Sequence, residues 1–329
     1  MVEMSLFDDL MVDTSSGDYS HILSAIEGFL KANTSCELFT QNLGDKKANL
    51  IAVFGKPTLL VSCHMDTVKP CKGWSVPPYQ ATEKDGKFFG LGAADTKGNL
   101  LALLQAVAKA EPKNLMLLFN VDEESGPQTG MHAFLKSEFA SSLKHALVCE
   151  PTTLKLVNQH TGYSSFWIEV PGKAKHSSEA DQDNAITTAS RILLGLEKKA
   201  FMIGKIEGGL SGNMVPDSCK FKCSIRSYLA QAQIVSLIKE ILAPYPGVAI
   251  TESFVGPSLV PNTTFPYLDL PCEEAEFWTE ASLLSLAGIP SVVLGAGNIA
   301  QAHSADEFVE KSQLEAFEKM LIQLFGEFP

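Results

Sequence analysis

Short, largely apolar segments recur along this chain, and polar residues able to form a site follow them. The segments occupy residues 59–61, 115–121, 145–149 and 290–295. A strand that helices cover on both faces stays apolar along its length, whereas a half-exposed strand alternates. These segments therefore predict buried strands of a parallel sheet, in which ligand sites gather at the carboxyl ends of the strands.

Helical segments lie between and after these strands. Residues 19–33, 100–110, 281–287 and 312–325 carry apolar side chains in a pattern typical of helices. Strands that alternate with helices in this way indicate an α/β fold, with a mixed, mainly parallel sheet and helices on both of its faces. We assign this catalytic domain to residues 1–160 and 261–329.

The pattern changes between residues 161 and 260. Residues 165–170 and 221–226 predict strands on an antiparallel plan, and residues 185–196 and 234–242 predict helices. Such a segment suits a small two-layer α+β domain. We expect it to be inserted into the catalytic domain.

Composition argues against several classes of partner. The chain has 329 residues, of which 38 are acidic and 26 basic, and its formal charge of -12 repels nucleic-acid phosphates and anionic membranes. The first ten residues lack the regions of a secretion signal, and no apolar run is long enough to cross a membrane. The seven cysteines include no Cys-x-x-Cys pair. We therefore expect a cytoplasmic protein with free thiols that binds neither nucleic acid nor membrane.

A histidine and an aspartate follow the first apolar segment directly. Side chains alternate along a strand, so His64 and Asp66 leave the backbone on the same face. A carboxylate in this position can orient an imidazole that binds a metal ion. Taken alone, the pair also fits an ordinary strand end with two unrelated polar residues.

A glycine-rich turn precedes the helix at residues 100–110 and allows two interpretations. Gly90-x-Gly92-x-x-Asp95 superficially matches a dinucleotide-binding turn. However, Asp95 takes the place of the third glycine, and its carboxylate would lie against a pyrophosphate. In the second interpretation the glycines permit a tight turn from which Asp95 points into a cation site.

The candidate ligands suit divalent transition metals. They are two imidazoles and three carboxylates: His64, Asp95, Glu124, Glu150 and His303. Such a mixture favours zinc, cobalt or manganese over calcium, which prefers oxygen alone. With one carboxylate shared, the five residues can serve two ions about 3.5–4 Å apart. Of the adjacent Glu123 and Glu124, one can bind metal while the other acts as a general base near a metal-bound water.

The motifs together resemble the M20-type binuclear zinc aminoacylase/carboxypeptidase family of metallopeptidases. The resemblance runs from about residue 59 to 308 and is carried by His64-x-Asp66, Gly90-x-Gly92-x-x-Asp95-x-Lys97-Gly98, Asp122-Glu123-Glu124, Glu150-Pro151-Thr152 and Gln301-Ala302-His303. Within this family, Trp278-Thr279-Glu280-Ala281 and residues 295–303 are most similar to the acetylornithine deacetylases. The resemblance implies a zinc-aminopeptidase-like catalytic domain and makes residues 161–260 a lid and dimerisation domain.

Metal-binding roles follow from the resemblance. Asp95 would bridge two metal ions, with His64 and Glu150 on one ion and Glu124 and His303 on the other. The ions would be zinc, for which cobalt can substitute.

Further roles follow for residues that bind no metal. Asp66 would orient His64, and Glu123 would be the general base. In the inserted domain His176 would reach an active site, commonly that of the partner subunit, and stabilise the oxyanion. Asn213 and Arg226 would hold the carboxylate of the substrate, because they fall where relatives bind this group.

The implied reaction is hydrolysis of the amide bond of an N-acyl amino acid by a homodimer. N2-acetylornithine, in arginine biosynthesis, is the leading substrate; acetylcitrulline, acetyl-lysine, succinyl-diaminopimelate and a peptide are alternatives on the same metals. A binding protein that has lost catalysis is an alternative of another class, and the intact Glu123 argues against it. The chain is shorter than typical relatives, which leaves the dimer arrangement and the role of His176 open.

Overall fold

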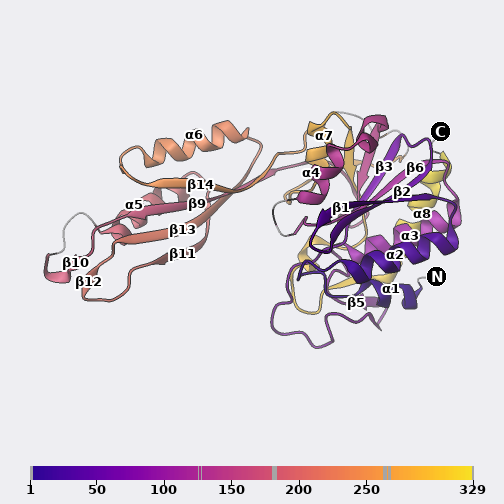
Figure 1. Cartoon of the computed structure of the whole chain (residues 1–329), viewed down its shortest axis with the longest axis horizontal. Helices are drawn as coiled ribbons and strands as arrows, with labels where there is room; N and C mark the ends of the chain where they lie inside the picture. The colour runs from indigo at the N-terminus through magenta and orange to yellow at the C-terminus, as the bar shows by residue number, and fades with distance from the viewer. Residues whose placement is uncertain are drawn as a thin grey trace. The chain divides into compact units, whose positions relative to one another are not determined.

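A computed structural model describes residues 3–124, 126, 128–179, 184–261, 265 and 268–327, and they form two compact units. The first unit comprises Met1–Gln159, Leu259–Ala275 and Thr279–Pro329, and the second His160–Ser258 and Glu276–Trp278. Residues 276–278, which we assigned to the catalytic domain, cluster with the second unit. Both units are coloured along the chain in Figure 1.

An eight-stranded mixed sheet forms the first unit, in the order β1-β2-β6-β3-β7-β16-β8-β15. The four central strands run parallel, and they are β6 (Asn114–Asn120), β3 (Leu59–His64), β7 (His145–Val148) and β16 (Ser291–Val293). The flanking strands are β1 (Glu37–Gly44), β2 (Lys47–Gly55), β8 (Leu156–His160) and β15 (Cys272–Ala275). The central strands are the ones predicted from the apolar segments.

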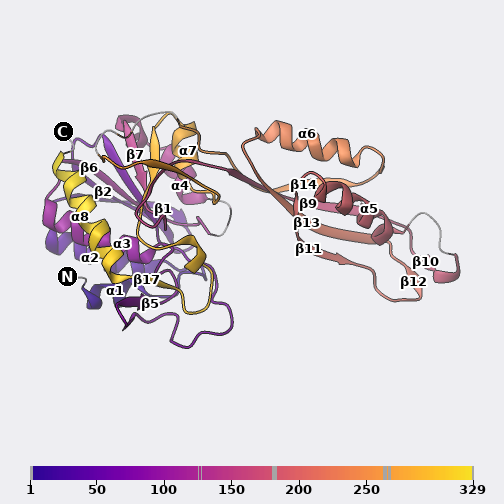
Figure 2. The ribbon, with the colours of Figure 1, turned by 180° about the vertical axis from the view of Figure 1, so that it is seen from behind.

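Helices cover both faces of this sheet (Figures 1 and 2). One face carries α1 (Met4–Leu10), α2 (Ser20–Asn33), α3 (Lys97–Ala110) and α8 (Lys311–Glu327), and the other carries α4 (Thr129–Leu135) and α7 (Ala281–Leu286). Every residue of β3 is buried, as a strand covered on both faces requires. The predicted mixed, mainly parallel sheet with helices on both faces is therefore confirmed.

A small three-stranded sheet, β17-β5-β4, joins two segments that are distant in sequence. It consists of β4 (Thr82–Lys84), β5 (Lys87–Phe89) and β17 (Phe308–Glu310). The glycine-rich turn follows β5, and the loop with His303 precedes β17. The antiparallel pairing of Phe89 with Phe308 thus brings the turn and the loop to the same place.

The second unit has a core of its own. Its four-stranded antiparallel sheet, β11-β13-β9-β14, consists of β9 (Gly162–Pro171), β11 (Met202–Gly208), β13 (Ser218–Ser227) and β14 (Ala249–Gly256). The helices α5 (Ala185–Glu197) and α6 (Gln231–Leu242) pack their apolar faces on this sheet. A separate two-stranded antiparallel sheet pairs β10 (Lys175–His176) with β12 (Met214–Val215). This is the two-layer arrangement expected from the sequence.

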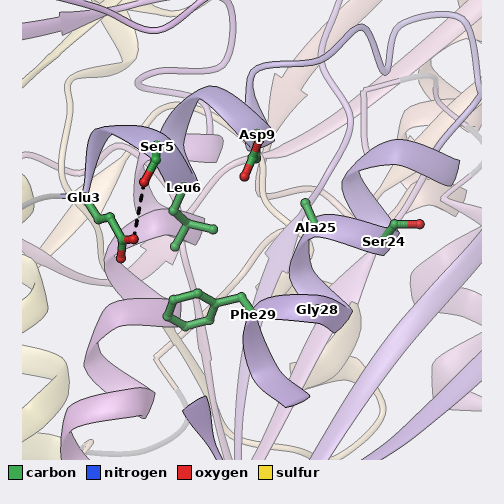
Figure 3. Close-up of a pocket in the computed structure, with 8 residues that line it drawn as sticks. All are labelled: Glu3, Ser5, Leu6, Asp9, Ser24, Ala25, Gly28 and Phe29. Carbon is green, nitrogen blue, oxygen red and sulfur yellow. Dashed lines mark hydrogen bonds between the residues drawn. The ribbon is translucent and has the colours of Figure 1, made fainter. Parts of the chain in front are cut away.

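The remaining short elements are the 3-10 helices η1 (Glu138–Ser142), η2 (Ser177–Glu179) and η3 (Ile299–Gln301). Among the helices that the structure describes, none is long and apolar enough to cross a membrane. A hollow between α1 and α2, with Glu3 and Asp9 on one side and Ala25 and Phe29 on the other, is shown in Figure 3. None of the predicted site residues lines it.

Candidate metal centre

Three strand ends and two loops bring the predicted ligands together. His64 ends β3, Glu124 follows β6, and Glu150 follows β7. Because these three strands are parallel neighbours, their carboxyl ends lie on one edge of the sheet. Asp95, from the turn before α3, and His303, from the loop before β17, complete the cluster.

Two groups of residues that could each hold a metal ion share Asp95. In the first, His64 Nε2 lies 3.1 Å from Asp95 Oδ1 and 3.7 Å from Glu150 Oε1. In the second, His303 Nε2 lies 2.9 Å from Glu124 Oε1 and 3.4 Å from Asp95 Oδ2. Each carboxylate oxygen of Asp95 thus faces one group. Two imidazoles and three carboxylates in this arrangement suit a pair of divalent transition-metal ions.

Burial and mutual attraction shape the charges of the cluster. Burial alone would raise the pKa of Asp95, but hydrogen bonds with His303 and His64 hold it below its ordinary value. Hydrogen bonds with Asp95 and Glu124 raise the pKa of His303 to about 11. Burial and the charge of Asp95 raise the pKa of Glu150. The three carboxylates therefore concentrate negative charge where they are poorly hydrated, and a cation would relieve that cost.

The glycine-rich turn needs its glycines to bring Asp95 into the cluster. Gly92 has a φ of +88°, and a Cβ atom there would approach Cγ2 of Thr67 to 2.9 Å. A Cβ atom on Gly98 would lie 2.2 Å from the carbonyl oxygen of Ala93. Any larger residue would displace the turn and move Asp95.

Glu307, to which the sequence interpretation gave no role, occupies the inside of this turn. Its carboxylate accepts hydrogen bonds from the N–H groups of Gly92, Ala94 and Asp95, at 3.1, 2.9 and 3.0 Å. Burial raises the pKa of Glu307 to about 7. These N–H groups therefore face a carboxylate of the chain itself, which argues against the dinucleotide-binding interpretation of the turn.

Asp66 contacts the His64 ring and, in addition, a backbone segment that was not predicted as its partner. Its carboxylate oxygen Oδ1 lies 3.6 Å from His64 Nδ1, and the hydrogen bond of this nitrogen, 3.0 Å long, is with the backbone oxygen of Asp66. The carboxylate instead accepts hydrogen bonds from the N–H groups of Glu123, at 3.2 Å, and Glu124, at 2.9 Å. Asp66 therefore contacts both the His64 ring and the turn that follows β6.

Glu123 and Glu280 are further carboxylates near the cluster. Burial raises the pKa of Glu123, and the charges of Glu124 and Glu280 add to this effect, whereas His64 opposes it. Glu280 is buried and accepts a 2.6 Å hydrogen bond from Nδ2 of Asn120, while its Oε1 has no hydrogen-bond partner among the described residues. Burial raises the pKa of Glu280 to about 8. Glu280 lies in a motif that we quoted for the family resemblance, but no role was predicted for it.

The second unit holds the three predicted substrate-contacting residues in two places. His176 and Asn213 meet at the two-stranded β10–β12 sheet, where Ser177 N–H donates to the backbone oxygen of Asn213 at 3.0 Å. Arg226 stacks over the Tyr163 ring and donates a 3.3 Å hydrogen bond to the backbone oxygen of Glu276. β12 ends three residues before Ser218, the first residue of β13. Arg226 lies eight residues farther along β13, a distance of roughly 26 Å from Ser218.

The pattern of a known peptidase family covers most of the sequence. Its match runs over residues 60–327 and includes both candidate metal groups. The chain belongs to peptidase family M20/M25/M40. This peptidase-family chain is 32% identical to the N-acetyl-L-citrulline deacetylase of Xanthomonas campestris pv. campestris, over 83% of each chain.

Other similar proteins agree with the family assignment. The M20/M25/M40 chain is 32% identical to the acetylornithine deacetylase of Buchnera aphidicola subsp. Schizaphis graminum, with 86% of this chain and 84% of the relative covered. Its fold is also that of an M20 family metallo-carboxypeptidase from Sulfolobus solfataricus, with a TM-score of 0.78 at 17% identity over 98% of each chain. The predicted family resemblance is thus confirmed.

Proposed function

We propose that this chain is a metal-dependent amidohydrolase that removes the acyl group from an N-acyl amino acid, with N2-acetylornithine as the leading substrate. The observation that carries the proposal is Asp95, whose two carboxylate oxygens each face one group of metal-competent residues. Identity of about 30% to acetylornithine and acetylcitrulline deacetylases over most of the chain supports this class of substrate. The product would be the free amino acid. If that product is ornithine, the reaction would be a step in arginine biosynthesis.

In the proposed site, Asp95, His64 and Glu150 would hold one ion, and Asp95, Glu124 and His303 the other. A bound pair of zinc ions, for which cobalt can substitute, would polarise the acyl carbonyl and make water more acidic. Glu123 takes a proton from the attacking water and returns it to the leaving nitrogen. Among the described residues Glu123 belongs to neither metal group, and burial raises its pKa, which makes it a stronger base than an ordinary carboxylate.

An assay of the amino group that hydrolysis frees tests this function. We expect turnover of acetylornithine, its loss after chelation and its recovery on addition of zinc or cobalt, together with about two metal ions per chain. Acetylcitrulline, acetyl-lysine, succinyl-diaminopimelate and a dipeptide form the comparison panel, because no motif in the chain specifies the acyl or side-chain pocket. Turnover of the dipeptide alone would replace the deacetylase with a peptidase, and turnover of none would contradict both.

Asp66 is expected to support the metal site without binding metal. Asp66→Ala removes the acceptor for the N–H groups of Glu123 and Glu124 and the negative charge beside His64. We expect metal affinity to fall by roughly 10 to 100-fold, as it does when partners of metal ligands are lost. Titration of the metal-free protein with zinc measures this. Asp18→Ala is the matched control, since Asp18 also accepts a backbone N–H but pairs with exposed Lys46; equal affinities in the two variants would contradict the role of Asp66.

The second unit favours a homodimer. Asn213 and Arg226 lie at opposite ends of β13, too far apart for both to hold one small substrate within a single chain. With two subunits, one chain would supply His176 and Asn213, and its partner Arg226. The edge strand β11 and helix α5 also expose a set of apolar side chains, namely Ile186, Leu194, Met202 and Ile206.

This apolar set provides a test of the dimer. Leu194→Glu combined with Ile206→Glu places two charges on side chains that are 59% and 51% exposed. We expect light scattering after gel filtration to give a dimer mass for the parent protein and a monomer mass for this variant. Leu286→Glu, which charges an exposed leucine of the first unit, is the control. A monomeric parent protein would contradict the proposal.

A cytoplasmic location also remains a proposal, and the seven free cysteines support it.

A further inference from the structure

Glu307 connects the two loops that supply the shared carboxylate and one imidazole of the proposed site. Besides its three side-chain contacts with the turn at Gly92, Ala94 and Asp95, its backbone oxygen accepts a 3.0 Å hydrogen bond from Gly90 N–H. One residue therefore accepts four of the backbone N–H groups between residues 90 and 95. Glu307 is only 1% exposed, so water does not compete for these bonds.

The loop that carries Glu307 also carries His303, four residues earlier. A second contact also holds this loop. Asp306 accepts hydrogen bonds from the N–H and the hydroxyl of Ser75, each 2.7 Å long. Immediately after Glu307, β17 pairs with β5. The loop is thus held on both sides. Among the described contacts, the Glu307 carboxylate is the only direct link between this loop and the backbone of Asp95.

The chemistry of these contacts requires a carboxylate. Glu307 Oε1 accepts from both Ala94 and Asp95, and Oε2 accepts from Gly92. Glutamine has the same shape, but its amide nitrogen donates and would face an N–H donor in place of one oxygen. Lys97 is fully buried nearby; burial lowers the pKa of Lys97 to about 7, and the charges of Asp13, Glu307 and Asp66 oppose this effect.

We propose that Glu307 is a positioning residue of the metal centre, which holds the backbone of Asp95 and the His303 loop in register so that both groups of ligands form. Glu307 itself belongs to neither metal group. This inference rests on the metal centre of the proposed function and extends it to a residue outside the ligand set.

The test compares Glu307→Gln with Glu318→Gln in otherwise complete protein. Glu318, on α8, is also a buried glutamate of the first unit. It pairs with Lys109 on α3, away from the ligands. Circular dichroism first verifies that each metal-free variant is folded, and competition with a chromophoric zinc chelator then measures affinity. We expect Glu307→Gln to weaken zinc binding by roughly 10 to 100-fold and Glu318→Gln to leave it unchanged. Excess zinc should restore turnover in Glu307→Gln without a change in KM.

A role confined to stability would give another result. Glu307→Gln would then lower the melting temperature of the metal-free protein but keep the zinc affinity of the parent, and this outcome would overturn the proposal. If Glu307→Gln does not fold, Glu307→Asp is judged by the same affinities, because it keeps the carboxylate but shortens its reach. A parent protein that binds no metal would refute the metal centre itself, whereas two ions in both parent and variant with equal affinity would refute only the role of Glu307.

Discussion

Glu123→Gln should retain both metal ions and lose nearly all turnover. Glutamine keeps the size of the side chain and can form hydrogen bonds, but it cannot accept a proton from water. General-base catalysis contributes typically 10² to 10⁴-fold, so we expect turnover to fall by about that factor. Metal binding should persist because Glu123 belongs to neither metal group among the described residues.

Metal analysis and acetate release on the same preparation measure both quantities. Glu318→Gln again serves as the control, because it neutralises a buried glutamate outside the site. Turnover near that of the parent would remove Glu123 from the role of base. Loss of metal together with turnover would instead place Glu123 among the ligands.

Asp95→Asn should prevent both ions from binding. Asp95 is the one residue that the two groups share, with Oδ1 3.1 Å from His64 Nε2 and Oδ2 3.4 Å from His303 Nε2. The neutral amide removes the negative charge between the two imidazoles, and its nitrogen cannot act as a ligand oxygen. We expect less than one zinc per chain and no measurable acetate release.

Glu124→Gln provides the contrast for this prediction. Glu124 belongs to the group with His303 and not to the group with His64 and Glu150. We therefore expect this variant to retain one ion. The number of ions that a substitution removes should equal the number of metal groups to which the residue belongs. Equal metal content in the Asp95→Asn and Glu124→Gln variants would contradict a bridging role for Asp95.

The positions of the candidate ligands could be predicted because their signals are local. Residues 115–119 are apolar without interruption, and in the structure β6 is buried along nearly its whole length. A polar residue directly after such a strand lies at its carboxyl end, whatever the rest of the fold does. His64, Glu124 and Glu150 were found in this way, and the prediction that they share one edge needed only parallel strands.

Contacts with backbone N–H groups could not be predicted. Glu307 binds the turn at residues 92–95, more than 200 positions earlier in the chain. Every residue except proline offers the same N–H donor, so no residue type in the turn marks the partner of Glu307. The second contact of Asp66 escaped prediction for the same reason, because its partners are the N–H groups of Glu123 and Glu124.

Strand direction and register also lie beyond the sequence patterns. Asn213 and Arg226 were predicted to act on the same substrate carboxylate, yet the β10–β12 sheet and the far end of β13 hold them apart. Periodicity shows which face of a strand is buried, but not which distant residues lie beside its two ends.

The sequence by itself determined the strands, the helices and the ligand types, because hydrophobic period and side-chain chemistry belong to each segment alone. Only the tertiary structure decided that Asp95 divides its two oxygens between two groups, that Glu307 holds the turn from inside, and that Arg226 lies far from His176. These features depend on the distances between segments. The packing of the sheet, the turn and the loops together determines those distances.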